Sequence, residues 1–391
     1  APGTTITTLQ AVSTTAGTYP YSATVLPLRG QVPAGSNLQS TTNATMRGTI
    51  LSKHDDGSAA VVVVAGSITV GANATSSITV QTGTPTAGTA LTAAAISALV
   101  SSVAVNFGGT YGIASLTNFA SPERVWWAND QTICARYRAA APTPGTTALE
   151  AVIDVQAWAT GRALVEVVVE NCKLTGLEAP NATAPTSYSG RPVATPAAAS
   201  YTGAVVTVNG TTVVTVNGNG APEGAHSFGR AWYVRHWVGG DPGLRVTQLH
   251  TDLQKHPLLW KADAPNTASL TGYAADTYTP WTSGRQRASN MGQGGNHSSI
   301  GPLPKWQAQA LQTGDAGAWK ATEVSDLAVL GYAVNHRNSA TGDVPTIAEV
   351  ATYSMNAGIN AWPQIGNSQN GAMGWEVPHH PAVGLMSFLA D

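Results

Sequence analysis

Apolar and polar residues alternate along most of the first 265 positions, which is the pattern of strands with one buried face. The clearest case is residues 149–158, where Leu, Ala, Ile and Val face one way and Glu150 and Asp154 face the other. Residues 163–170 repeat the pattern, with Glu166 and Glu170 on the polar face. The alternation predicts a mainly β fold over this part of the chain.

Short turn signals separate the predicted strands. Asn209-Gly210 lies between two apolar runs and predicts a two-residue hairpin. Residues 71–73 predict a second hairpin, between strands at 67–70 and 77–81. Residues 92–100 are rich in Ala and form the one helical interruption that the pattern predicts before residue 266.

Residues 226–263 differ from the chain around them, because His, Arg and Trp are concentrated there. In an extended chain, positions 230, 232, 234 and 236 share one face, and positions 231, 233, 235 and 237 share the other. Residues 239–243 predict a turn and residues 245–250 a return strand, so we interpret the stretch as a hairpin with bulky groups on both faces. Such a hairpin is covered on both sides, which predicts a seam that joins the β domains to the helical part.

The apolar period changes after about residue 266. Residues 304–313 and 316–334 follow a helical period, and Gly314-Asp315 separates them. A third predicted helix begins near Pro381, and the sequence ends within it. We therefore expect that the natural protein continues, or that this helix packs on another chain. The fold class predicted is mainly β with a C-terminal α part.

Composition narrows the classes of function. Only 10% of the 391 residues are charged and the net charge is −2, which argues against a protein that binds nucleic acid through a basic face. No apolar run approaches the roughly 20 residues of a membrane span. Low charge with many Thr, Ala, Val, Gly and Asn residues is typical of β-rich extracellular or virion proteins. Cys134 and Cys172 fall on strands that a third strand separates, so a disulfide is not the default expectation.

Several motifs follow one another in order along the chain. They are Asp56-Gly57-Ser58, the strand at 126–138, YVRHW at 233–237, LHTDLQ at 249–254 with His256-Pro257, IGPLPKW at 300–306, VNHR at 334–337 and VPHHP at 377–381. The set resembles the N-terminal half of large tailed-phage virion or tail-fibre-like proteins. Those proteins are in turn similar to the exo-rhamnogalacturonan-lyase (YetA-like) architecture.

The resemblance implies an N-terminal β-barrel, a central antiparallel β-sandwich and then an (α/α) toroid. With it, the chain divides into an N-terminal arm at 1–20, a β-barrel-like domain at 21–120, a β-sandwich domain at 121–265 and a loop-rich, α-helical domain at 266–391. This sequence departs from that pattern because it would hold only the first helices of a toroid, so we expect an incomplete toroid without a full sugar-cleaving cleft.

A polysaccharide lyase needs a cation that neutralises a uronate, a base that takes a proton and an acid for the leaving oxygen. The catalytic candidates are His336, Arg337, His379 and His380, at predicted junctions of loops and helices; buried polar structure is the other interpretation. Adjacent His residues diverge on a helix and have no third ligand nearby, so neither a metal site nor a cofactor is predicted. The candidates for sugar contact further along the chain are His297, Trp375 and Glu376.

Two clusters before residue 266 allow a second interpretation. Trp232, Arg235 and Trp237 are candidates for stacking on sugars, and the alternative is an inter-domain seam with contacts between Arg and aromatic rings. The carboxylates of strands 149–158 and 163–170 allow a paired-carboxylate glycosidase site. The bland alternative, which we favour, is the solvated face of an antiparallel sheet.

These observations favour a structural virion component of a tailed phage, of the tail-fibre or capsid-surface type, rather than an enzyme. Such a protein would self-assemble into a homo-oligomer or bind other virion proteins, contact host surface glycans and be located in the virion or outside the cell. The alternatives are a secreted polysaccharide lyase of the rhamnogalacturonan type and a carbohydrate-binding adhesin without catalysis.

Overall fold

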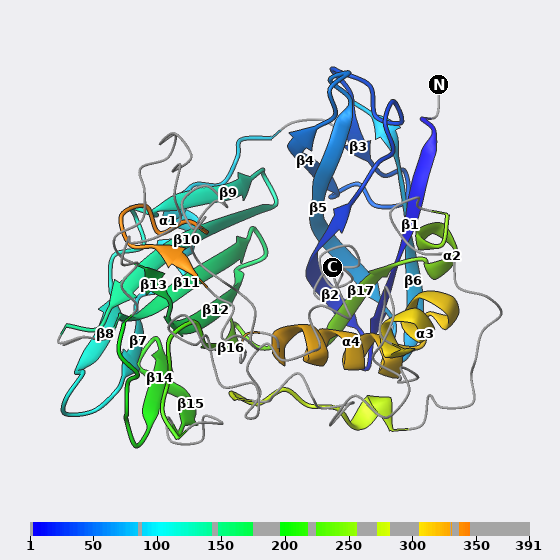
Figure 1. Cartoon of the computed structure of the whole chain (residues 1–391). Helices are drawn as coiled ribbons and strands as arrows, with labels where there is room; N and C mark the ends of the chain where they lie inside the picture. The colour runs from blue at the N-terminus through cyan, green and yellow to red at the C-terminus, as the bar shows by residue number, and fades with distance from the viewer. Residues whose placement is uncertain are drawn as a thin grey trace, which may run out of the picture.

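The described residues form a mainly β protein with helices in its C-terminal part, as the alternation predicts (Figure 1). This computed structural model describes residues 3–84, 88–142, 148–174, 196–217, 224–255, 272–281, 305–328, 330 and 336–344. Most strands belong to two β units, which Figure 1 shows side by side, the first in blue apart from the green strand Leu244–Gln248 and the second mainly in cyan and green.

The first β unit consists of two sheets around one apolar core. One sheet has the order β17-β1-β6-β3 and the other β2-β5-β4. The inward positions of β1, β2, β5 and β6 are fully buried Leu, Ala, Val and Ile residues. The strands are β1 (Thr5–Ser13), β2 (Gly17–Val25), β3 (Asn37–Gln39), β4 (Arg47–Lys53), β5 (Ala59–Val70), β6 (Ala74–Gly83) and β17 (Leu244–Gln248).

Two predictions for this unit are wrong. Thr5–Ser13, which was assigned to an N-terminal arm, forms β1 in the middle of a sheet, because its alternating apolar side chains complete the core of the unit. The predicted hairpin around residues 71–73 has its turn, with Asn73 at a φ of 52°, but β5 and β6 do not pair with each other. They pair with β2 and β1 instead, so both pairs of strands pass together from one sheet to the other.

The second β unit is a sandwich of a five-stranded and a four-stranded antiparallel sheet. The orders are β16-β12-β11-β10-β9 and β15-β14-β7-β8, and one core lies between them. Its elements are α1 (Ala93–Ser97), β7 (Val103–Asn106), β8 (Ile113–Leu116), β9 (Arg124–Ala128), β10 (Thr132–Ala140), β11 (Leu149–Trp158), β12 (Arg162–Asn171), β14 (Ala204–Val208), β15 (Thr211–Val216) and β16 (Ala231–Val238). The strands β7 and β8 contribute to this core although they fall within the 21–120 range predicted for the first domain.

Local signals within the second unit are confirmed. The hairpin of β14 and β15 turns at Asn209 and Gly210, whose φ values are 51° and 76°, the positive values that this turn requires. The predicted helix at 92–100 is α1. Cys134 on β10 and Cys172 after β12 are both free and buried, and burial raises the pKa of both thiols.

The stretch at 226–263 contains a seam, but not the predicted hairpin. The strand β16 pairs with β12 in the second unit and β17 pairs with β1 in the first, so the chain crosses between units at residues 239–243. Across the seam, the Trp158 indole of the second unit donates to the Tyr21 carbonyl of the first unit over 3.3 Å. Within the second unit, Trp158 on β11 stacks on Trp237 on β16, with ring centroids 5.2 Å apart. The stretch therefore joins the two β units, and α2 (His250–Leu253) at its end contacts the helices.

Two of the predicted C-terminal helices are confirmed. They are α3 (Lys305–Thr313) and α4 (Ala316–Ala328), which pack against α2 and the 3-10 turn η2 (Tyr273–Ala275) around Trp306 and Trp319. Two short strands, β13 (Lys173–Leu174) and β18 (Arg337–Asn338), pair in parallel. The third predicted helix lies outside the described residues, and a toroid stays a prediction. No helix in the described part is long and apolar enough to cross a membrane.

Candidate functional site

The register of the five-stranded sheet arranges charged side chains in rows on its outer face, the face turned away from the sandwich core. One row pairs Arg136 with Asp154, Asp154 with Glu166, and Glu166 with Arg235. In a second row, Glu150 on β11 lies directly opposite Glu170 on β12. Because side chains directly opposite in an antiparallel pair are in contact range, the second row brings two carboxylates together.

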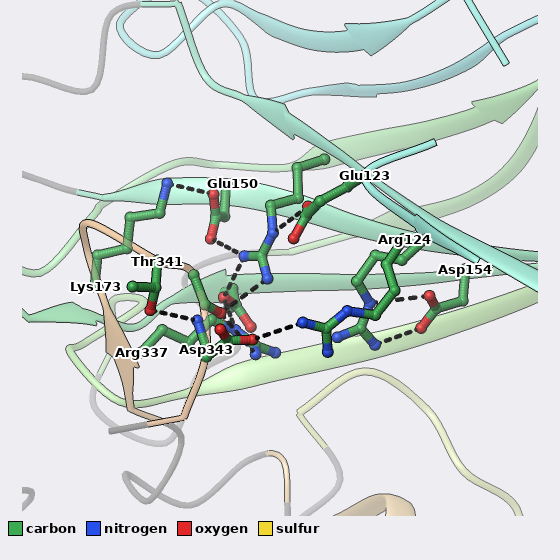
Figure 2. A network of polar contacts seen from close by, with 12 residues as sticks. Glu123, Arg124, Glu150, Asp154, Lys173, Arg337, Thr341 and Asp343 are labelled. Atoms are coloured by element: carbon green, nitrogen blue, oxygen red, sulfur yellow. Dashed lines mark hydrogen bonds and ion pairs between the residues drawn. The ribbon is translucent and has the colours of Figure 1, made fainter. Parts of the chain in front are cut away.

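Cations from three separate segments surround these two carboxylates (Figure 2). Glu150 accepts from the Arg138 guanidinium over 2.9 Å and from the Lys173 ammonium over 2.6 Å. Glu170 accepts from the guanidinium of Arg337 on β18. Both carboxylate side chains are almost fully buried, at 2% and 1% exposure. We call these five residues the ionic cluster.

The 336–344 segment covers the ionic cluster. Its strand β18 pairs with β13, and its Gly342 carbonyl accepts from Arg138 over 2.9 Å. At its far end, Asp343 lies 3.4 Å from the guanidinium of Arg124 on β9. The cluster thereby fastens a C-terminal segment to a sheet formed more than 160 residues earlier in the chain.

Burial changes the acid–base behaviour of the cluster. The pKa of Glu170 is raised to about 7, mainly because burial penalises the charged carboxylate, and the neighbouring Glu150 adds to the rise. The Arg337 guanidinium acts in the opposite direction and favours the ionised form. Glu170 therefore gains or loses its proton near neutral pH.

The other row on the outer face is also internally paired. The Arg136 guanidinium binds both oxygens of Asp154, at 2.9 and 2.6 Å, and the Trp126 indole donates to the same carboxylate over 3.0 Å. The Tyr233 hydroxyl donates to Glu166, and burial raises the pKa of that carboxyl group. The prediction of a solvated face is wrong for Glu150 and Glu170, since other parts of the chain cover them.

The same contacts bear on the glycosidase interpretation. Each of the four carboxylates, Glu150, Asp154, Glu166 and Glu170, has a partner within the chain. A hydrolase needs two carboxyl groups that face a sugar, and Glu150 and Glu170 face cations beneath the 336–344 segment instead. Within the described residues, no group of three or more His, Cys, Asp or Glu side chains is placed to hold a metal ion.

The two catalytic candidates that the structure describes are adjacent in sequence, and both make contacts within the chain; His336 is buried and Arg337 is half-buried. His336 is 9% exposed and its ring stacks on Phe228, with centroids 5.1 Å apart. Burial lowers the pKa of His336 to about 4, so the ring is neutral near pH 7. Arg337 belongs to the ionic cluster. The remaining candidates, His297, Trp375, Glu376, His379 and His380, lie outside the described residues.

The three aromatic and basic candidates on β16 separate by face. Trp232 points into the sandwich core, is fully buried and donates to the Tyr201 hydroxyl over 2.9 Å, so its assignment as a sugar contact is wrong. Trp237 belongs to the seam with Trp158. Arg235 is half exposed and pairs with Glu323 on α4 over 3.0 Å. Among these three, Arg235 is the side chain that remains most open to a ligand.

No protein-family model, curated protein or solved structure matches this chain. The resemblance to phage virion proteins and to exo-rhamnogalacturonan lyases therefore stays a prediction.

Proposed function

We propose that this chain is a structural component of a self-assembling particle, of the tail-fibre or capsid-surface type found in tailed phages. The observation that carries the proposal is the ionic cluster, in which Glu150 binds Arg138 and Lys173 and Glu170 binds Arg337, so that these charges join segments of the chain. A virion or extracellular location accords with the low charge content of the sequence.

The physical argument rests on how charged groups are used. Catalysis needs side chains whose reactive atoms remain available to a substrate in a concave site. In the described part of the chain, Asp154 pairs with Arg136 on the neighbouring strand, while Glu170 with Arg337 and His336 with Phe228 join segments that are distant in the sequence. This use of charge stabilises one arrangement of the chain, which is what a particle subunit requires.

The oligomeric state tests the proposal. We expect purified full chain to form a homo-oligomer with closed or helical symmetry, visible by electron microscopy and by sedimentation at micromolar concentration. In the second arm, the purified chain is mixed with other proteins of the same particle, because some subunits assemble only with a different subunit. A chain that stays monomeric in both arms would contradict the proposal.

One observation favours the polysaccharide lyase as a second candidate. Glu170 has a pKa raised to about 7, which suits proton abstraction, and it contacts Arg337 next to His336, although its side chain is only 1% exposed in this arrangement. Incubating the full chain with rhamnogalacturonan and following the ultraviolet absorbance of unsaturated ends tests it. A lyase would produce absorbance that the Glu170→Gln variant loses; no absorbance from the native chain would exclude this activity.

A further inference from the structure

A pocket of about 430 Å³ lies where the free edge of the five-stranded sheet meets α4. Residues of β15, β16, the segment at 277–280 and α4 line it. Figure 1 shows β16, the edge strand of the five-stranded sheet, close to α4. The volume is within the roughly 300–1,000 Å³ that is usual for small-molecule sites. It is separate from the ionic cluster, since the two share no residue.

The walls of this pocket are mostly apolar. Val234 and Val324 contribute buried surface, and Val213, Pro280 and Leu327 contribute half-buried surface. Such walls favour a ligand with a hydrocarbon or aromatic body, because each square ångström of apolar surface removed from water contributes roughly 25 cal/mol.

Two tyrosine rings complete the walls. Tyr233 and Tyr278 lie edge to face, with centroids 6.1 Å apart. Their hydroxyl groups are already engaged, because Tyr233 donates to Glu166 and Tyr278 accepts from the Tyr233 backbone N–H over 3.0 Å. Since the hydroxyls have these partners, the rings offer the pocket their carbon faces and edges.

The charged side chains that line the pocket are partly exposed, and positive charges outnumber negative ones among them. The side chain of Arg235 is 50% exposed and that of Glu323 is 39% exposed, and they form one ion pair. Lys320 is also exposed, and its ammonium donates to the Ala274 carbonyl over 2.9 Å. Among the lining residues, two cations and one carboxylate leave one positive charge. The Glu166 carboxyl group, bound to the Tyr233 hydroxyl, also acts on Arg235, and burial raises the pKa of that carboxyl group and so favours its neutral form. Glu323 uses one Arg235 nitrogen out of a guanidinium with five N–H donors.

We propose that this pocket binds a small monocarboxylate whose body is aliphatic or aromatic, with the body against Val324 and Leu327 and the carboxylate between Arg235 and Lys320. The charge surplus selects one negative charge, and the apolar walls select against a strongly hydroxylated ligand. The inference goes beyond the proposed assembly role and does not depend on it.

Binding of 4-phenylbutyrate and of its neutral amide to the full chain tests this site. We expect saturable binding of both probes by calorimetry or ligand-observed NMR, with the carboxylate binding more tightly. Arg235→Gln and Lys320→Gln should each weaken carboxylate binding roughly threefold and leave amide binding unchanged, because each removes a solvent-exposed charge. Lys53→Gln, which changes an exposed lysine on β4 of the first unit, is the matched control and should alter neither.

A second variant fills the pocket without depending on charge. Leu327 is half-buried, so Leu327→Trp can be accommodated, and a thermal melt monitored by circular dichroism confirms folding. It should abolish binding of both probes. No saturable binding to the native chain, or full binding to folded Leu327→Trp, would overturn the proposal. A monomer that binds the probe contradicts only the assembly role, and an oligomer that does not bind contradicts only this site.

Discussion

The two faces of the five-stranded sheet are built from the same strands and differ in what covers them. The inner face carries Val165, Val167 and Val169, which pack on the second sheet of the same sandwich. The outer face carries Glu150 and Glu170, which are equally buried but lie beneath Arg337 and the segment that contains it. The inner face is stabilised by apolar burial, and the outer face by pairing of charges.

The difference shows that burial and hydrophobicity are separate properties of a face. Apolar burial is favourable by itself, whereas a buried charge is tolerated only when a partner compensates the loss of water. The inner face should therefore tolerate changes that conserve volume, and the outer face should depend on the identity of each partner. The following four predictions test this contrast, from the largest expected effect to the smallest.

The largest effect is expected on the inner face. Trp232→Ala removes a fully buried indole and its hydrogen bond to Tyr201, and we expect a loss of about 3–5 kcal/mol in the free energy of unfolding. Urea denaturation followed by tryptophan fluorescence measures it. Trp126→Ala on the outer face is the control; because Trp126 is partly exposed, it should cost clearly less. Equal losses would show that the two faces do not differ in this way.

Removing one buried carboxylate comes second. Glu150→Ala leaves Arg138 and Lys173 without their common partner, and we expect a loss of about 3 kcal/mol. Glu123→Ala is the matched control, because Glu123 also pairs with Arg138 but is 39% exposed, and it should cost less than about 1 kcal/mol. Denaturant unfolding compares the two variants. If Glu150→Ala costs no more than Glu123→Ala, the ionic cluster does not stabilise the outer face.

The inner face could be predicted from the sequence, whereas the cover of the outer face could not. A period of two places Glu150 and Glu170 opposite the valines, but the register that makes them neighbours depends on the turn and on pairing. The cover comes from Arg337, 167 residues after Glu170, and no local pattern specifies a contact of that span. The alternation also placed Trp232 with Val234, and that shared parity was the available signal that Trp232 faces the core.

The joint between units shows the same limit. Residues 239–243 have turn chemistry, with Gly239 and Gly240 at positive φ, and this local signal predicted a hairpin. Leu244–Gln248 pairs with β1 and not with β16. β1, the first strand of the chain, offers an edge for pairing and an apolar face that matches that of Leu244–Gln248. The residue types of the VNHR motif at 334–337 indicated candidate functional residues, but only the fold shows that Glu170 is the partner of Arg337.

The third prediction concerns pH. The pKa of Glu170 is raised from 4.5 to about 7 in the folded chain, so between these values the folded state binds a proton that the unfolded state has released. Its contribution to stability is complete below pH 4.5 and is lost as the pH rises to about 7. The free energy of unfolding of the native chain, relative to Glu170→Gln, should fall between pH 5 and 7, by at most about 1.4 kcal/mol per pH unit.

Comparison with Glu170→Gln removes the contributions of groups distant from Glu170, so the difference reports the Glu150–Glu170 pair. The pKa values of His226 and His336 are lowered to about 4, so their contributions are present above pH 6.5 and are lost as the pH falls through 4, with the opposite sign. Both histidines are present in the two proteins, so their contributions cancel in the difference. A difference that is constant between pH 5 and 7 would show that Glu170 keeps an ordinary pKa.

The smallest change in the free energy of unfolding is expected at Asp343, near the exposed end of the 336–344 segment. Asp343→Asn removes the ion pair with Arg124, in which both side chains are more than half exposed, and retains the backbone hydrogen bond from Asn338 to the residue 343 carbonyl. Exposed pairs of this kind contribute about 0.2–1 kcal/mol, so the free energy of unfolding should change by less than 1 kcal/mol.

Amide hydrogen exchange at residues 338–342 shows which end of the 336–344 segment holds it on the sheet, the buried ionic cluster or the exposed pair of Asp343 with Arg124. If the buried cluster holds it, Asp343→Asn leaves protection there nearly unchanged, whereas Glu150→Ala reduces it; the reverse order would assign the fastening to the exposed pair.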